Sequence, residues 1–138
     1  MCDSTGLLQH AVHCVPDRSH GYCVDDNARA LLFACSLGKD GEPHLPDRLT
    51  TRFAAFVQHA WNPDTQRFRN FMSYDRRWLE PVGSEDSHGR TLWALAECAR
   101  LGVTWFECPL PEVPEHYPAI RRLRAQANAA GLRLAGAE

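Results

Sequence analysis

Apolar residues recur at helical spacing in three separate segments, and this periodicity constrains the fold more than any other feature of the sequence. Steps of three and four residues place such side chains on one face of a helix. The second segment carries the longest stripe, and the third starts after Ser84, a good N-cap. The stripes are Ala28, Leu31, Leu32 and Cys35; Leu49, Phe53, Phe56, Val57 and Ala60; and Leu92, Leu95, Ala96 and Ala99. They predict helices from Asp25 or Asp26 to Gly38, over about 47–59, and over 84–102.

Weaker patterns predict two more helices, over 4–13 and 119–130. Turn-forming residues predict a loop over 16–21 and a turn over 62–65. Partial alternation over 66–72 predicts a short strand or an extended loop. Four prolines between 109 and 118 exclude regular structure there. We therefore predict a mainly α fold of helical hairpins.

The charge balance excludes several classes of partner. The 138 residues carry a formal net charge of −2, so no basic field favours nucleic acid or a membrane surface. No apolar stretch is long enough to span a bilayer, and no secretory leader precedes the first helix, which favours the cytoplasm. The six cysteines are therefore expected to be reduced thiols. None are spaced as Cys-x-x-Cys, so we expect neither a metal nor a cofactor.

Two clusters place carboxylates at predicted helix starts. One runs from Tyr22 to Arg29 and contains Asp25 and Asp26; the other, 83–90, contains Glu85 and Asp86. The structural interpretation is that these acids cap the helices and pair with an arginine one turn later. The functional interpretation is that they form a catalytic pair, since glycoside hydrolysis needs two carboxyl groups on opposite sides of the scissile bond.

Aromatic side chains surround the two clusters and favour the functional interpretation. Flat aromatic faces stack on sugar rings, while carboxylates, amides and guanidiniums bind the hydroxyls. No glycine-rich phosphate loop, Gly-x-Ser-x-Gly elbow or His-Glu-x-x-His pair points to another reaction class. The aromatic residues are Tyr22, Trp61, Phe68, Phe71, Tyr74, Trp78 and Trp93.

Four runs of the sequence resemble a bacterial (α/α)-toroid domain related to the six-hairpin glycosidases. They are DSTGLLQHA at 3–11, PDRSHGYCVDDNARAL at 16–31, FRNFMSYD at 68–75 and GSEDSHGR at 83–90. Domains of this kind are often attached to glycosyltransferases or encoded beside them. The resemblance covers 3–102 and implies an incomplete (α/α)6 toroid over 1–102, followed at 103–138 by a proline-rich segment and a helix that looks like a non-native continuation.

The resemblance also implies an active site where the inner helices of the toroid begin. Asp25, Asp26, Glu85 and Asp86 would be catalytic there. An oligosaccharide, with a preference for mannose-type glycans, would be the ligand, and a glycosyltransferase domain is the implied protein partner. The residues expected to bind the substrate are His20, Tyr22, Asn27, Arg29, Asn70, Tyr74, Asp75, Trp78, His88 and Arg90.

Length is the main departure from the family pattern. A complete toroid of about twelve helices needs on the order of 190 residues. We therefore expect a piece of a larger protein that exposes apolar faces and self-associates. Three hypotheses stay open: a glycoside hydrolase-like module with paired carboxylates, a non-catalytic glycan-binding or accessory domain of a glycosyltransferase, and a structural fragment whose acids are only helix caps.

Overall fold

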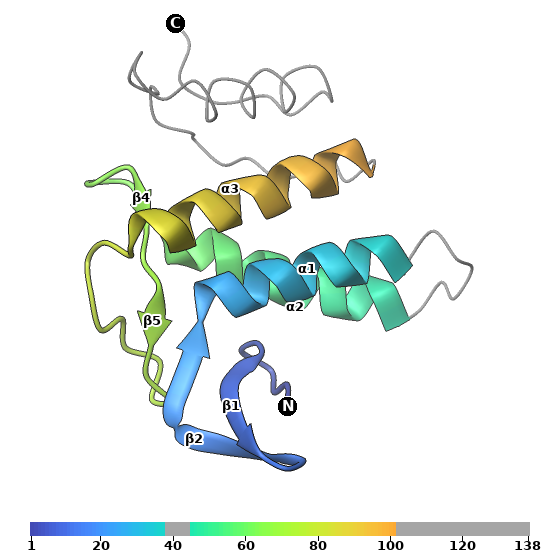
Figure 1. The fold of residues 1–138 in the computed structure, drawn as a ribbon, viewed down its shortest axis with the longest axis vertical. Helices are drawn as coiled ribbons and strands as arrows, with labels where there is room; N and C mark the ends of the chain where they lie inside the picture. Colours follow the sequence, from blue (N-terminus) through green and yellow to red (C-terminus); the bar gives the residue numbers. More distant parts are fainter. Residues whose placement is uncertain (38–44, 102–138) are drawn as a thin grey trace, which may run out of the picture.

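Three helices form at the three apolar stripes (Figure 1). They are α1 (Val24–Leu37), α2 (Leu45–Ala60) and α3 (Glu85–Arg100). The structure is a computed structural model and describes residues 1–37 and 45–101. The helices expected in these segments are confirmed. The helix expected over 119–130 and the whole of 103–138 lie outside the described residues.

The predicted mainly α class is wrong, because the described residues also form two antiparallel sheets. The fold is mixed α/β and is not a toroid of helical hairpins. The first sheet has the strand order β1-β2-β5, from β1 (Leu8–Val12), β2 (Val15–Cys23) and β5 (Phe71–Met72). The second pairs β3 (Trp61–Asn62) with β4 (Arg67–Phe68).

The helix predicted over 4–13 and the loop predicted over 16–21 are together a β-hairpin. Leu8 pairs with Tyr22 and Val12 with Val15, and a bulge lies between Leu8 and His10. His13 turns the chain with a φ of 56°. A helix over 4–13 would bury Leu8 and Val12 on the same face, but in the structure Leu8 is buried and Val12 is exposed. Hairpin pairing with the adjacent strand β2 therefore outweighs the helical spacing of the apolar residues.

The core lies where α1 packs against both α2 and α3. Figure 1 shows α1 and α3 running in the same direction and α2 running in the opposite one. Leu31 and Ala34 of α1 and Cys98 of α3 are completely buried. Val57 of α2 is 1% exposed. These are residues of the predicted stripes or their direct neighbours. The two parallel helices bring their N-terminal ends to the same side of the molecule.

Candidate functional site

A network of ion pairs joins the start of α1 to the start of α3, and we call its five residues the carboxylate–arginine cluster. They are Asp25, Asp26, Arg29, Asp86 and Arg90. On α1, Nη2 of Arg29 lies 3.0 Å from Oδ2 of Asp25 and also contacts Asp26. On α3, the guanidinium of Arg90 donates to both oxygens of Asp86, at 3.1 Å from Nε and 2.9 Å from Nη2. Its Nη1 lies 3.6 Å from Oδ2 of Asp25.

The local sequence explains each half of the cluster. Acidic residues in the first turn of a helix complement the macrodipole, and an arginine one turn later pairs with them. Ser84 caps α3 by accepting a hydrogen bond from the N–H of Ser87, at 3.1 Å. The contact between Arg90 and Asp25 is not local, since it depends on the parallel packing of α1 and α3. Two of the predicted catalytic acids, Asp25 and Asp86, thus share one guanidinium.

Asp25 is the least exposed acid of the cluster. Its side chain is 15% exposed, against 24% for Asp26 and 71% for Asp86. Its Oδ1 is buried and accepts no hydrogen bond from any described residue. A buried carboxylate oxygen without a donor is costly, so this atom is the strongest unused acceptor of the cluster.

Glu85, the fourth predicted catalytic acid, lies outside the cluster. Its Oε1 accepts a hydrogen bond of 2.7 Å from Nη1 of Arg67, and its side chain is 73% exposed. This hydrogen bond lowers the pKa of Glu85. A general acid needs a raised pKa, so the environment of Glu85 does not favour that role.

Several residues predicted to bind substrate are buried and serve the fold instead. The hydroxyl of Tyr22 donates to Oδ2 of Asp3 at 2.6 Å. The side chain of Asn27 accepts from the N–H of Leu7 at 2.7 Å and donates to two carbonyls, of Leu7 and of Cys23. Oδ1 of Asn70 accepts from the Cys23 thiol at 3.2 Å. These side chains use their polar atoms to fix the N-terminal segment and β5 against α1.

His88 is also buried, and its environment disfavours the charged form. Its Nδ1 accepts a hydrogen bond of 3.3 Å from the N–H of Phe68. Burial and the neighbouring charge of Arg67 lower its pKa from 6.5 to about 4, although Glu85 opposes them. His88 is therefore a neutral structural residue.

Acid should destabilise the fold through His88. Between pH 6.5 and about pH 4 the unfolded histidine binds a proton that the folded one does not, so stability falls as the pH falls. We expect a loss of about 2 to 3 kcal/mol over this window. Denaturant unfolding at several pH values measures it. His88→Asn retains an acceptor for the Phe68 N–H but cannot titrate; if the wild type and this variant lose equal stability, the prediction is wrong.

The remaining predicted binding residues lie away from the cluster. His20 is exposed on β2, where its ring contacts that of His10 and its Nε2 lies 3.6 Å from Oδ2 of Asp17. Asp75 is exposed and pairs with Arg77. Tyr74 stacks on Tyr22, whereas Trp78 packs between Phe56 and His59. The structure therefore does not gather the predicted site residues into one place.

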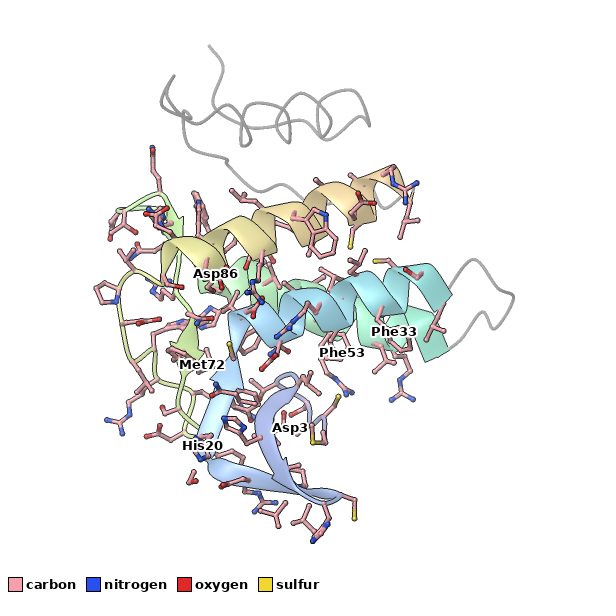
Figure 2. The ribbon with its side chains drawn as sticks, in the orientation of Figure 1. Asp3, His20, Phe33, Phe53, Met72 and Asp86 are labelled. Carbon is pink, nitrogen blue, oxygen red and sulfur yellow. The ribbon has the colours of Figure 1, made fainter. Side chains whose placement is uncertain are left out.

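Two exposed aromatic side chains lie one turn beyond the arginines of the cluster. Phe33, labelled in Figure 2, follows Arg29 by four residues and is 63% exposed. Trp93 follows Arg90 by three residues and is 44% exposed. Residues three or four apart are neighbours on a helix surface. We did not predict Phe33 as a site residue, yet its position off the stripe of α1 indicated that it faces outward.

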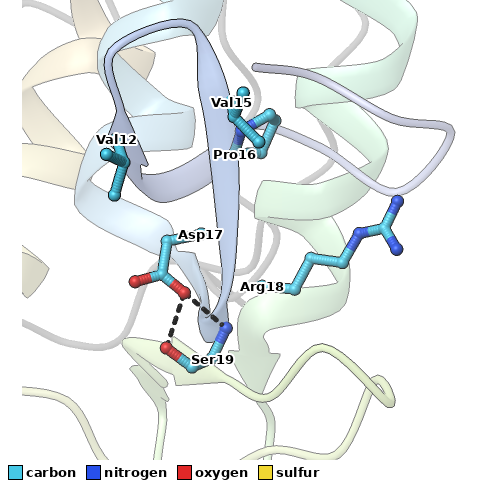
Figure 3. A pocket seen from close by; sticks show the side chains of 6 residues that line it. All are labelled: Val12, Val15, Pro16, Asp17, Arg18 and Ser19. Atoms are coloured by element: carbon cyan, nitrogen blue, oxygen red, sulfur yellow. Dashed lines mark hydrogen bonds between the residues drawn. The ribbon is translucent and has the colours of Figure 1, made fainter.

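A hollow of about 700 Å³ lies at the hairpin of β1 and β2 (Figure 3). None of the four predicted catalytic acids lines it. Its one carboxylate, of Asp17, already accepts hydrogen bonds from the N–H and the hydroxyl of Ser19, at 2.9 and 2.6 Å. The lining residues are Val12, Val15, Pro16, Asp17, Arg18 and Ser19.

Neither a metal cluster nor a membrane span is found in residues 1–37 and 45–101. No three or more of the His, Cys, Asp and Glu side chains in these ranges are grouped to hold a metal ion. None of the helices in the same ranges is long and apolar enough to cross a bilayer.

Comparison of the chain with protein-family models and with curated proteins gave no match. The family resemblance of residues 3–102 therefore stays a prediction.

Proposed function

We propose that the protein is carbohydrate-active and binds an oligosaccharide at the carboxylate–arginine cluster. The observation that carries the proposal is the bridge from Asp25 through Arg90 to Asp86, which joins two helix starts into one array of donors and acceptors. Neighbouring hydroxyls of a sugar are matched by such an array, because carboxylates accept and guanidiniums donate two hydrogen bonds at fixed spacing.

The aromatic side chains beside the cluster support this ligand class. Phe33 and Trp93 offer exposed apolar faces one helical turn after Arg29 and Arg90, and a sugar ring has one apolar face that can stack on such a side chain. The sequence resemblance of residues 3–102 to carbohydrate-active proteins points the same way, and it is the basis for preferring mannose-type glycans.

Arg90 and Arg100 give a matched pair of variants for the binding test. Both lie on α3, both are largely exposed, and each pairs with an acid. We expect Arg90→Met to weaken binding of a mannotriose about tenfold to a hundredfold, since it removes charge-assisted hydrogen bonds. Arg100→Met should bind as the wild type does. Titration calorimetry measures both; equal affinities, or no binding of mannotriose or cellotriose by the wild type, would reject the proposal.

Glycoside hydrolysis is the second candidate function, and the spacing of Asp25 and Asp86 permits it. Both carboxylates contact nitrogens of one guanidinium, so their separation lies within the upper limit of about 9.5 Å for the paired acids of glycoside hydrolases. The test is release of reducing sugar from an oligosaccharide. Release by the wild type that is abolished in Asp25→Asn would establish hydrolysis. Binding without turnover would instead assign the module an accessory role, serving a glycosyltransferase domain.

A further inference from the structure

Two buried cysteines lie opposite each other near the C-terminal ends of α1 and α3. Asp25 of α1 and Asp86 of α3 both contact the guanidinium of Arg90, so the first turns of the two helices lie near each other. Because the helices are parallel and rise equally per residue, Cys35, ten residues after Asp25, and Cys98, eight residues after Arg90, lie at a similar distance further along their helices. Both side chains face the core between the helices.

The two thiols are also chemical neighbours. A hydrogen bond with the Cys98 thiol lowers the pKa of Cys35, and the hydroxyl of Thr50 on α2 lowers it further, although burial opposes both. The same contact with Cys35, together with burial, raises the pKa of Cys98. Cys35 is also the more exposed of the two, at 8% against 0% for Cys98, so we expect Cys35 to react first with an external oxidant.

We propose that Cys35 and Cys98 form a redox-active pair that closes to an intramolecular disulfide between α1 and α3. The oxidant is a low-molecular-weight disulfide such as glutathione disulfide. The Cys35 thiolate attacks one sulfur of the oxidant and expels a thiolate, leaving a mixed disulfide. Cys98 then loses its proton to the expelled thiolate and attacks the sulfur of Cys35, expelling the second one. The protein loses two electrons and the oxidant becomes two thiols.

Both thiols are buried, and their position at helix ends lets an oxidant reach them through local opening. Cys35 is in the last turn of α1, which ends at Leu37, and Cys98 is in the last turn of α3, which ends at Arg100. Helix ends open locally at low free-energy cost, in contrast to helix centres. Cys23 is buried as well, but its thiol donates to Asn70 and burial raises its pKa.

The test is oxidation of the full chain with glutathione disulfide, followed by non-reducing peptide mapping. We expect a peptide pair linked through Cys35 and Cys98, a mass 2 Da lower than that of the reduced chain, and a rise in Tm on the order of 10 °C, because the bond closes a long loop. If instead glutathione adducts or links are confined to Cys2 and Cys14, which are exposed, the proposal is wrong.

Variants separate the pair from the other thiols. Cys98→Ser should abolish both the linked peptide and the rise in Tm, whereas Cys14→Ser, a change at an exposed thiol, should preserve both. A rise in Tm that survives in Cys98→Ser would overturn the assignment. If Cys98→Ser does not fold, the peptide map of the oxidised wild type decides alone, because it identifies the linked residues directly.

Discussion

Gly21→Ala is expected to destabilise the fold by about 3 to 5 kcal/mol, a large part of the stability of a small domain. Gly21 lies in β2 with a φ of +64°, a conformation that side chains other than glycine adopt at a cost. A Cβ at this position would also lie 2.2 Å from the carbonyl oxygen of Met72, a backbone atom of the paired strand β5. Since that oxygen cannot move alone, β2 and β5 would separate.

Gly89→Ala is the matched control for this prediction. Gly89 is in the second turn of α3, and a Cβ there would meet no atom within 4 Å. Alanine has the higher helix propensity, so this variant should gain about 0.5 to 1 kcal/mol. Denaturant unfolding of the two variants measures both values. A loss below 1 kcal/mol in Gly21→Ala would contradict the described pairing of β2 with β5.

Asn27→Ala should cost about 3 kcal/mol, since it breaks three hydrogen bonds at a completely buried position. The N–H of Leu7 and the carbonyls of Leu7 and Cys23 would lose their partner. The side chain of Asn27 is the direct polar link between the N-terminal segment and α1, so limited proteolysis should also cut near Leu7 sooner in the variant.

Ser36→Ala provides the comparison on the same helix. Its hydroxyl donates to the carbonyl of Leu32 at 2.9 Å, but at an exposed site where water replaces the lost partner. We expect a change within about 0.5 kcal/mol. If Asn27→Ala and Ser36→Ala prove equally mild, Asn27 does not hold the N-terminal segment in solution.

The helices were predictable because their determinants are local. Ser84 caps α3 as its sequence position indicates, and the apolar stripes of all three helices are the faces that pack. The β-hairpin was not predictable in the same way. Leu7, Leu8, Ala11 and Val12 fit helical spacing, so the apolar pattern alone favours a helix. The strand depends instead on backbone pairing, from Val12 with Val15 to Leu8 with Tyr22, and the spacing of apolar side chains does not report this pairing.

The candidate site was predictable only in part. Asp25 and Asp86 do come together, but through Arg90, whose reach to Asp25 depends on how α1 and α3 pack, whereas Glu85 pairs with Arg67 instead. Polar residues near the expected site, such as Asn27 and His88, are buried and hydrogen-bond to the backbone. The sequence alone does not show which polar side chains are buried. An amide or an imidazole can hydrogen-bond to a sugar hydroxyl or to a backbone group equally well.

The pairing of β2 with β5 also sets an order of events during synthesis on the ribosome. The hairpin of β1 and β2 is made early, and α1 and α2 can pack as neighbours soon afterwards, yet Tyr22 and Cys23 gain their partners in β5 only after Met72 and Phe71 have been translated. Until then the edge of β2 carries unpaired backbone groups that another nascent chain could bind. Slow translation through residues 61–72 would prolong that exposure, and a chaperone that covers exposed strands would shorten it.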